Sequence, residues 1–420
     1  MPEQDRMTLM AASIKKMLLA LAFGLACLTA ADAATFSVKR GINLDNWVTW
    51  PSEDKWGDPA VILPFPEWRR SLGTDGLRAL RQSGLDFVRM PIDPAPLLSP
   101  AAAPLQSQLL DSMLESVKLA NAAGLKVIVD LHTLPWGDDR SLSTGRLMED
   151  DALFDRYVEL VRTVAARLAY EDPTQVAFEP INEPTADCQA GDKVWPDRLK
   201  RLFAASRASA TRLTLILQGS CWSSAEGLTR IDPSDFPDDN LIWTFHSYAP
   251  FLLTHQGASW AGDFIRYVTG LPYPPAVDGQ DAADTLERIR ETIRREAPLL
   301  RRDAMIAYLD EQFAEIDTPE KVRAVMARDF DTVEEWARRH GVAADDILLG
   351  EFGMIRQEYA HPFVMNPQWR AAYSRDMIEL AEKHGFAWSI WSYGGAFGVV
   401  EAFDNQPAEP DVMDMIRSLR

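Results

Sequence analysis

The chain has 420 residues, of which 47% are hydrophobic and 25% charged, and its formal net charge is −19. This balance is typical of a soluble globular protein, and the length allows one large barrel-type domain with insertions or two ordinary domains. The negative charge repels phosphate backbones and argues against nucleic acid as a partner.

The N-terminus has the pattern of a signal peptide over residues 1–33. Two lysines precede the apolar run MLLALAFGLACLTA, and the small-residue sequence ADAA follows it. The apolar run is short for a membrane span. An uncleaved anchor is an alternative, and a lipoprotein signal at Cys27 is a weaker one, because Gly24 stands where such a signal carries a leucine-like residue. We expect cleavage after Ala33, a single domain over residues 34–420, a secreted or periplasmic location and no stable membrane insertion.

A pattern of amphipathic helix, glycine and short apolar strand recurs along the rest of the chain. LRALRQSG leads to LDFVRMP, LESVKLANAAG leads to LKVIVDLH, and MIELAEKHG leads to FAWSIW. Glycine is common where a helix ends, and continuous apolar runs are typical of parallel strands covered on both faces. The predicted strands are Lys39–Asn43, Asp86–Met90, Lys126–Leu131, Val176–Ile181, Leu213–Leu217, Leu241–Phe245, Ile347–Gly350 and Ala387–Trp391.

Eight strands alternating with helices predict a (β/α)8 TIM barrel. An open doubly wound sheet is the alternative, but GINLDNW after the first strand is not the glycine-rich phosphate turn of that fold. The connection between strands six and seven is unusually long. Within it, Thr318 and Pro319 predict the start of a helix over residues 319–340. The preceding segment is expected to be an insertion beside the active site, part loop and part charged helix.

Polar or aromatic residues follow nearly every predicted strand. In a TIM barrel these strand ends form the mouth, where active sites of the fold lie. Loops are polar in any case, but this mixture of acids, amides, histidines, an arginine and aromatics is more specific. The residues are Asn43, Asp45, Arg89, Asp130, His132, Asn182, Glu183, Gln218, His246, Tyr248, Glu351 and Trp391.

Six stretches at these ends resemble glycoside hydrolase family 5, a clan A family that contains the cellulases and many mannanases. In chain order they are VRMP, DLHTLPWG, INEP, HSY, GEFG and WSIWSYGG, and they cover roughly Arg40 to Gly395. Each motif is weak alone, whereas six in order at barrel spacing are specific.

The resemblance implies that Glu183 of INEP is the general acid/base and Glu351 of GEFG is the nucleophile. Glycoside cleavage needs one group to attack the anomeric carbon and one to protonate the leaving oxygen, and in retaining enzymes the two carboxyls stand about 5–5.5 Å apart. Glu179 lies four residues before Glu183 and is expected to point into the barrel and bind a buried partner. The alternative is that Glu183 and Glu351 are ordinary salt-bridge partners at the rim.

The resemblance also implies supporting roles. Arg89 matches the arginine that keeps the nucleophile ionised, which is compatible with a structural ion pair. Tyr248 matches the tyrosine that hydrogen-bonds the nucleophile. His132 and His246 match histidines that line the cleavage subsite, and Asn182 matches the asparagine that binds the sugar 2-hydroxyl.

Tryptophans are the expected sugar platforms, because indole offers a flat apolar surface to a sugar face. Trp391 matches the family tryptophan under the cleaved sugar. Trp47, Trp50, Trp136, Trp222 and Trp260 lie in predicted loops beyond strand ends, and for any one of them core packing is an equal alternative. Together they suggest a cleft for a chain rather than a pocket for one sugar.

No metal or cofactor is expected. The six histidines form no HExxH motif and no close pairs, and the chain has no GxSxG sequence. These patterns disfavour a zinc hydrolase and a serine hydrolase.

Cys188 and Cys221 are the two cysteines beyond the predicted signal peptide, and they follow strands four and five. Adjacent strands lie about 4.8 Å apart, and an exported protein meets oxidising conditions. The pair is therefore either a disulfide or two free buried thiols.

These features predict a secreted, monomeric, retaining glycoside hydrolase. It would cleave a β-linked glucan-type polysaccharide or oligosaccharide, as an endo-β-1,4-glucanase does, by double displacement. The alternatives are a β-mannanase, another β-glucanase or a transglycosylase of the same family, or a non-catalytic carbohydrate-binding relative.

Overall fold

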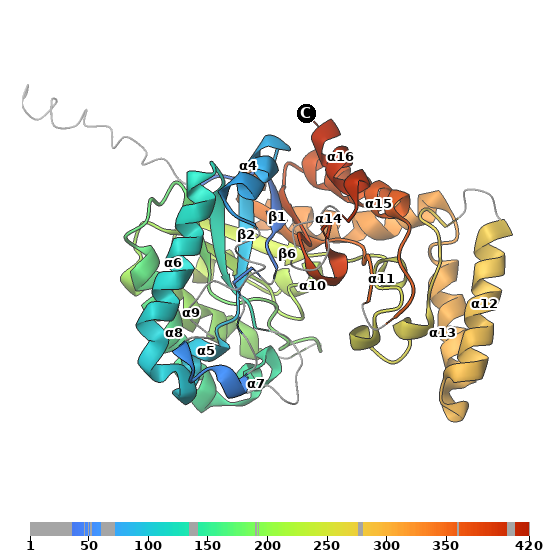
Figure 1. Cartoon of the computed structure of the whole chain (residues 1–420), viewed down its shortest axis with the longest axis horizontal. Coiled ribbons are helices and arrows are strands. Elements are labelled where there is room, and N and C mark those ends of the chain that lie inside the picture. Colours follow the sequence, from blue (N-terminus) through green and yellow to red (C-terminus); the bar gives the residue numbers. More distant parts are fainter. Residues whose placement is uncertain are drawn as a thin grey trace, which may run out of the picture. The chain divides into compact units, whose positions relative to one another are not determined.

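The computed structural model describes residues 36–45, 47–48, 50, 53–59, 72–133, 142–189, 191, 193–275, 280–358, 361–400 and 408–419. The predicted signal peptide lies outside these residues. The described chain forms a closed barrel of eight parallel strands in sequence order, and β8 pairs with β1 (Figure 1). The prediction of a (β/α)8 barrel is confirmed. The strands are β1 (Arg40–Asn43), β2 (Phe87–Ile92), β3 (Lys126–Leu131), β4 (Val176–Glu179), β5 (Thr214–Gln218), β6 (Leu241–His246), β7 (Ile347–Phe352) and β8 (Ala387–Ile390).

All eight predicted strands are present. Several of their bounds differ from the prediction by one or two residues, and two of these differences have local reasons. β4 ends at Glu179 rather than Ile181, because the next residue is Pro180, which has no N–H for the ladder. β7 continues to Phe352 rather than stopping at Gly350, so Glu351 belongs to the strand itself.

Helices surround the barrel, with α6, α8 and α9 along one side of the view in Figure 1 and α14, α15 and α16 on the other. The helices are α4 (Thr74–Gln82), α5 (Ala95–Leu98), α6 (Gln106–Ala122), α7 (Thr144–Glu149), α8 (Asp151–Leu168), α9 (Val194–Ser209), α10 (Ala225–Leu228), α11 (Phe251–Thr254), α12 (Gln280–Glu296), α13 (Arg302–Ala314), α14 (Pro319–His340), α15 (Pro367–Lys383) and α16 (Pro410–Ser418). Within the described ranges, no helix is both long and apolar enough to cross a membrane.

The barrel interior changes from apolar to polar along the strands. A buried cluster fills one level of the interior, and four of its members are Phe87, Ile128, Ala177 and Ile216. Because strand side chains alternate between faces, residues two positions later return to the interior. Those residues are Arg89, Asp130, Glu179 and Gln218, and all are buried. This apolar level, the apolar floor, therefore lies directly beneath the polar residues at the mouth of the barrel.

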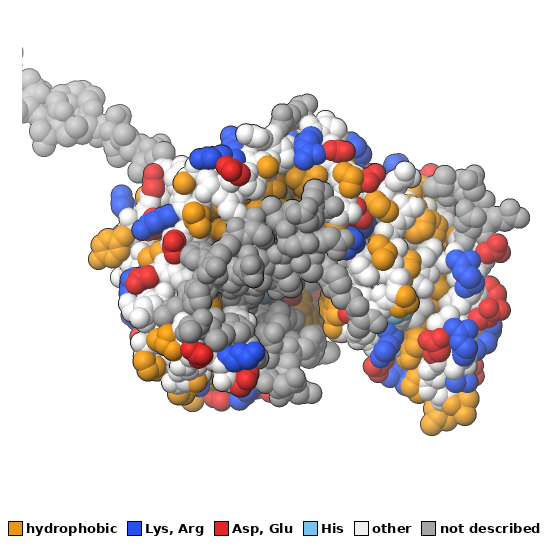
Figure 2. All heavy atoms as spheres, viewed as in Figure 1, with side chains coloured by type: hydrophobic (Ala, Val, Ile, Leu, Met, Phe, Trp, Pro, Cys, Tyr) orange, Lys and Arg blue, Asp and Glu red, His pale blue; other side chains and the backbone are white. Residues whose placement is uncertain are grey.

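The insertion between β6 and β7 is more regular than predicted. It begins with a loop, as expected, but its helical part is two helices, α12 and α13, which contact each other and stand at one edge of the molecule in Figure 1. The turn between them carries Leu299 and Leu300, which are 74% and 98% exposed, and hydrophobic side chains are visible at that end of the hairpin in Figure 2. The following helix, α14, begins at Pro319 and is capped by Thr318, as predicted.

A disulfide joins Cys188 to Cys221, with a Cα–Cα distance of 4.8 Å. The backbone N–H groups of Cys221 and Trp222 also donate to the carbonyls of Ala186 and Pro184, at 3.0 Å each. The loops after β4 and β5 are therefore tied together beside Glu183. This settles the two alternatives for the cysteines in favour of the bond.

We expect the double variant Cys188→Ser/Cys221→Ser to unfold at a lower urea concentration than the wild type. The bond closes a loop across a sequence separation of 33 residues, and the loss of such a cross-link costs about 3–4 kcal/mol in the chain-entropy model. Reductant should destabilise the wild type to the same level and leave the double variant unchanged. Two free thiols in the unreduced, denatured wild type, measured by alkylation and intact mass, would contradict the bond.

Candidate active site

The predicted site residues come together at the carboxyl ends of the strands. Arg89 lies within β2, His246 ends β6, and Glu351 lies within β7. His132 and Glu183 follow β3 and β4, and the loops after parallel strands leave the barrel on the same side. Contacts between these side chains connect five different strands of the barrel.

Arg89 is the centre of the site. Its guanidinium is fully buried and binds Glu179 with two hydrogen bonds, from Nε to Oε2 at 2.7 Å and from Nη2 to Oε1 at 2.9 Å. Nη1 donates to Glu351 Oε1 at 2.7 Å and to Asn43 Oδ1 at 3.0 Å. Nη2 also donates to Asn182 Oδ1 at 2.8 Å. The expectation that Glu179 points inward to a buried partner is confirmed, and the partner is Arg89.

Glu351 is held from two directions. Arg89 binds one carboxylate oxygen, and the hydroxyl of Tyr248 donates to the other at 2.9 Å. Burial and the neighbouring Glu351 raise the pKa of Tyr248, so the phenol stays a donor. The pairing register shifts at this point of β7, which lets Glu351 reach the interior directly after the inward-facing Gly350.

Gly350, the first glycine of GEFG, lies where a side chain would not fit. A Cβ at this position would lie 2.5 Å from Thr244 Oγ1 and 3.0 Å from His246 Nε2. Only a residue without a side chain leaves room for the His246 ring.

Glu183 lies in a different environment. Its backbone has a φ of 41°, a left-handed conformation that is unusual for a residue with a side chain. His246 Nδ1 lies 2.8 Å from its Oε1. Burial raises the pKa of Glu183 to about 7, while His132 and Arg89 oppose the shift. Burial lowers the pKa of His246 to about 4, so this imidazole is neutral at pH 7.

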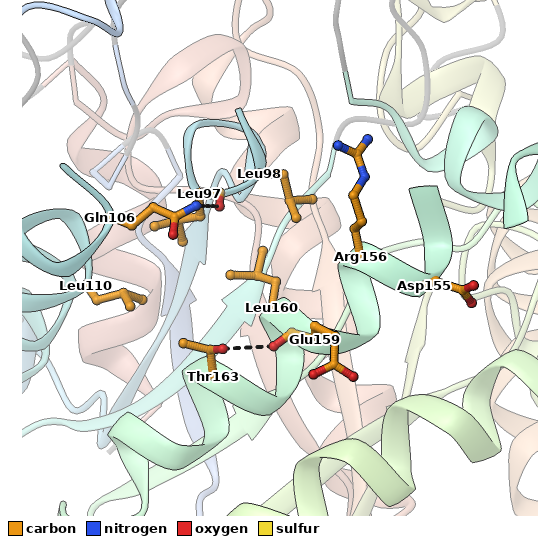
Figure 3. A pocket seen from close by; sticks show the side chains of 9 residues that line it. All are labelled: Leu97, Leu98, Gln106, Leu110, Asp155, Arg156, Glu159, Leu160 and Thr163. Carbon is orange, nitrogen blue, oxygen red and sulfur yellow. Dashed lines mark hydrogen bonds between the residues drawn. The ribbon is translucent and has the colours of Figure 1, made fainter. Parts of the chain in front are cut away.

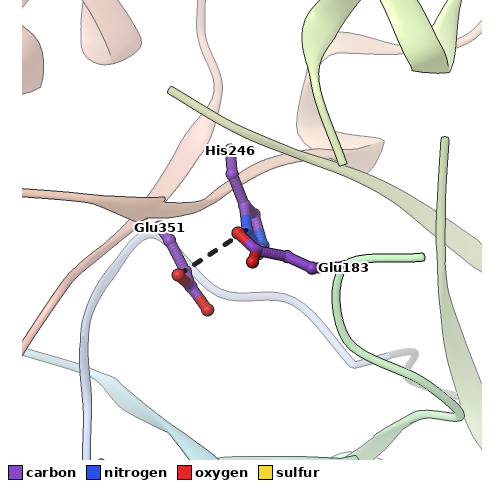
Figure 4. A group of neighbouring side chains, drawn as sticks. All are labelled: Glu183, His246 and Glu351. Atoms are coloured by element: carbon purple, nitrogen blue, oxygen red, sulfur yellow. Dashed lines mark hydrogen bonds and ion pairs between the residues drawn. The ribbon is translucent and has the colours of Figure 1, made fainter. Parts of the chain in front are cut away.

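Glu183 and Glu351 face each other beside His246 (Figure 4). One oxygen from each carboxyl and one nitrogen of His246 all lie within 4.8 Å of one another. One carboxyl is poised to carry a proton near neutral pH, and the other is held by two donors, so the pair has the composition of an acid and a nucleophile.

The same three side chains have the chemistry to bind a metal ion, and so does a second group, Asp331, Glu334 and His384. At the barrel mouth, however, the candidate ligand atoms are already engaged with His246, Tyr248 and Arg89. In the second group, Nδ1 of His384 is nearest Glu334, whereas Nε2 is nearest Asp331. One nitrogen of His384 and one oxygen of each carboxylate nevertheless lie within 4.8 Å of one another.

His132 lies on the other side of the mouth. Its ring stacks on Trp391, with centroids 5.3 Å apart and planes at 14°. Nδ1 is 2.8 Å from Asp130 Oδ2, and Nε2 is 3.2 Å from Asn182 Nδ2. Asn182 is fully buried, and its contact with a sugar hydroxyl remains a prediction.

The predicted tryptophan platforms have different environments. Trp222 is 36% exposed, whereas Trp47 is 3% exposed and packs in the hydrophobic core, which favours a packing role for it. Trp136 lies outside the described residues. Trp260 is 55% exposed and continues a series of ring contacts that runs from Tyr248 through His255.

Sequence reasoning noted four further polar residues at strand ends but gave them no role. Asp45 accepts from the backbone N–H of Gly394 at 2.8 Å. Asn43 binds Arg89, Asp130 binds His132, and Gln218 accepts from the backbone N–H of Glu183 at 3.3 Å. Their position at strand ends was the available signal. Except for His132, which follows the same strand as Asp130, their partners lie on or after other strands.

A pocket of about 470 Å³ lies away from this site, on the outer wall between α5, α6 and α8 (Figure 3). Its lining is Leu97, Leu98, Gln106, Leu110, Asp155, Arg156, Glu159, Leu160 and Thr163. None of the predicted site residues is among them.

Similarity to known proteins agrees with this geometry. The model of the cellulase family, glycosyl hydrolase family 5, matches residues 64–397. Endoglucanase C of Acetivibrio thermocellus is 21% identical over 384 residues, which cover 90% of this chain and 98% of that protein. Endoglucanase 3 of Fibrobacter succinogenes is 24% identical over 384 residues, covering 87% of this chain and 50% of that protein.

Solved structures share the fold. The cellulose synthase subunit Z of Clostridioides difficile matches with a TM-score of 0.63 at 19% identity, covering 90% of this chain and 99% of that one. Cel5A of Thermotoga maritima in complex with cellobiose matches with a TM-score of 0.60 at 20% identity, covering 90% and 97%. Since the family model spans the barrel from before β2 to beyond β8, the chain belongs to glycosyl hydrolase family 5, the cellulase family, and is a glycosyl hydrolase of endoglucanase type.

Proposed function

We propose that the protein is an exported, retaining endo-β-1,4-glucanase in which Glu183 is the acid/base and Glu351 is the nucleophile. The observation that carries the proposal is the contrast between two neighbouring carboxyls. Burial raises the pKa of Glu183 to about 7, whereas Arg89 and Tyr248 each donate a hydrogen bond to Glu351. The oxygens within 4.8 Å of each other support a retaining rather than an inverting separation.

In the first step, Glu351 attacks the anomeric carbon as the glycosidic C–O bond breaks. The bonding electrons leave with the aglycone oxygen, and Glu183 gives that oxygen its proton. The product is a glycosyl ester on Glu351 and a Glu183 carboxylate. Arg89 and Tyr248 orient the attacking carboxylate, and Asn182 is proposed to bind the 2-hydroxyl of the sugar, an interaction that tightens in the transition state.

In the second step, the Glu183 carboxylate takes a proton from water, and the water oxygen attacks the anomeric carbon. The ester bond breaks, Glu351 is released as a carboxylate, and the configuration of the sugar is retained. His246 is neutral, and its Nδ1 lies 2.8 Å from Glu183 Oε1. Its hydrogen bond to Glu183 can therefore adjust as Glu183 loses its proton in the first step and regains it in the second.

An extended glucan is the proposed substrate. Trp391 stacks on His132 next to the carboxyl pair, while Trp222 and Trp260 offer exposed indoles on other loops. The similar proteins named as endoglucanases support this choice. Export is supported by the leader-like N-terminal sequence and by the disulfide.

A reducing-sugar assay on β-1,4-, β-1,3- and β-1,2-glucans, mannan and xyloglucan tests the substrate. We expect the highest rate on β-1,4-glucan, with a mixture of oligosaccharides from the earliest times. Preference for mannan would make the protein a mannanase. Products larger than the starting oligosaccharide would identify a transglycosylase, and binding without turnover would identify a non-catalytic relative.

Azide rescue tests the roles of the two glutamates. Glu351→Ala should lower kcat by about 10⁴-fold or more, and azide should restore turnover with an inverted glycosyl azide. Glu183→Ala should instead give a retained glycosyl azide. Glu226→Ala, a change at an exposed surface position, serves as the control. Inverted product from Glu183→Ala would reverse the assignment.

The pH profile tests the proton on Glu183. A raised pKa means that the protonated form persists up to about pH 7 and is lost as the pH rises further. The value of kcat/KM should therefore fall above about pH 7 on a substrate with a poor leaving group. Glu183→Gln should remove this limb on an aryl glycoside whose leaving group needs no proton. A basic limb that persists unchanged in Glu183→Gln would exclude Glu183 as its source.

Glu179→Gln tests a structural role. Glu179 accepts two hydrogen bonds from a fully buried guanidinium, so the loss of its charge should lower the free energy of unfolding by about 1–3 kcal/mol. Urea unfolding measures this change, with the exposed Glu159→Gln as control. A fully stable Glu179→Gln protein with activity reduced by several orders of magnitude would show that Glu179 acts in the chemistry.

A further inference from the structure

We propose that Asp130 is a positioning residue that fixes the tautomer of His132 and, through it, the hydrogen bonds that His132 and Asn182 present to the sugar. The inference rests on the proposed function for its kinetic consequence, but not for its structural part. Asp130 itself does not reach the substrate, since it is fully buried at the end of β3.

The direction of the Asp130–His132 hydrogen bond follows from a third group. Oδ2 of Asp130 lies 2.8 Å from His132 Nδ1 and 3.0 Å from Arg89 Nη2. Nη2 of Arg89 already gives its two hydrogens to Glu179 and Asn182, so its contact with Oδ2 is an ion pair and does not by itself set the direction of the bond to His132. Oδ1, in contrast, is buried without a hydrogen-bond partner. The third group is Asn182: its Oδ1 accepts from Arg89, so its Nδ2 donates to His132 Nε2, and in a neutral ring Nδ1 is then the donor to Asp130.

The tautomer of His132 then determines whether its other nitrogen, Nε2, donates or accepts a hydrogen bond. Burial lowers the pKa of His132, which makes the ring neutral. A neutral imidazole with a proton on Nδ1 has an acceptor at Nε2. That nitrogen lies 3.2 Å from Asn182 Nδ2, whose amide can donate to it.

Asn182 is consequently oriented at both ends. Its Oδ1 accepts from Arg89 Nη2 at 2.8 Å, and its Nδ2 donates to His132. The opposite amide orientation would place two donors against each other at Arg89. His132 is 11% exposed at its side chain, and its ring stacks on Trp391. Asp130 thus acts on the mouth of the barrel through a residue that reaches it.

Two substitutions at Asp130 distinguish the effect of losing the negative charge from the effect of losing the oxygen that accepts from His132. Asp130→Asn retains one oxygen that can take the place of Oδ2, and its NH2 group occupies the place of Oδ1, which has no partner. Asp130→Ala removes the acceptor, so either nitrogen of His132 can carry the proton. Asp329→Ala is the matched control, because Asp329 is a carboxyl that binds Ser247 at 2.6 Å outside this network.

The kinetic test compares an aryl β-cellobioside with its analogue that lacks the 2-hydroxyl on the cleaved sugar. The ratio of the two kcat/KM values measures the contribution of that hydroxyl. Asp130→Ala should reduce the ratio by about tenfold, the equivalent of about one hydrogen bond. Asp130→Asn and Asp329→Ala should keep most of it. If Asp130→Ala lowers both kcat/KM values by the same factor, Asp130 is only structural and the proposal is wrong.

A spectroscopic test is independent of activity. With ¹⁵N-labelled histidine, NMR should show His132 as the Nδ1–H tautomer in the wild type, assigned by the signal lost in His132→Gln. Asp130→Ala should change that tautomer, whereas Asp130→Asn should not. An Nε2–H tautomer in the wild type would overturn the proposal, and this measurement needs no variant of Asp130 to fold. An inactive wild type with the expected tautomer would contradict the proposed function alone.

Discussion

One buried guanidinium organises the mouth of this barrel. Arg89 contacts the carboxylates of Glu179, Glu351 and Asp130, and it also binds two amides. A buried cation is costly to desolvate unless its donors are satisfied, and here they are directed at acceptors from several strands. The acids outnumber the cation, so burial leaves the pKa values of Asp130 and Glu183 near 7. A carboxyl with a pKa near 7 can give up and take back a proton near neutral pH, which acid/base chemistry requires.

The apolar floor makes this arrangement possible. Phe87 and Ile128 fill the interior one step below Arg89 and Asp130, and the buried cluster around them leaves the polar network a single open side. Low dielectric beneath the network strengthens each hydrogen bond within it. The same burial raises the pKa of Glu183 and lowers that of His246. Closure of the barrel therefore has two effects. It packs the apolar residues in the lower half, and it shifts the pKa values of the buried titratable groups in the upper half.

Irregular backbone is concentrated where the chemistry is proposed. Glu183 has a positive φ, and so do the consecutive residues Cys221, Trp222 and Ser223. Such conformations persist only where the surroundings hold them. The disulfide and the hydrogen bonds between the β4 and β5 loops provide that support, and Gln218 accepts from the N–H of Glu183. Glu183 is therefore held by its neighbours' backbone as well as by side chains.

The sequence by itself determined the barrel and its eight strands and predicted roles for the two glutamates, because apolar runs, helix-ending glycines and short motifs are local features of the chain. It also placed Asn43, Asp130 and Gln218 at strand ends without partners, and it left the cysteines and Trp47 with two alternatives each. The tertiary structure decided these points. Arg89 meets Glu179 across 90 positions and Glu351 across 262, and the helices α12 and α13 pair with each other only once folded. Contacts of this kind exist only after the barrel closes, since closure alone brings the ends of distant strands to one mouth.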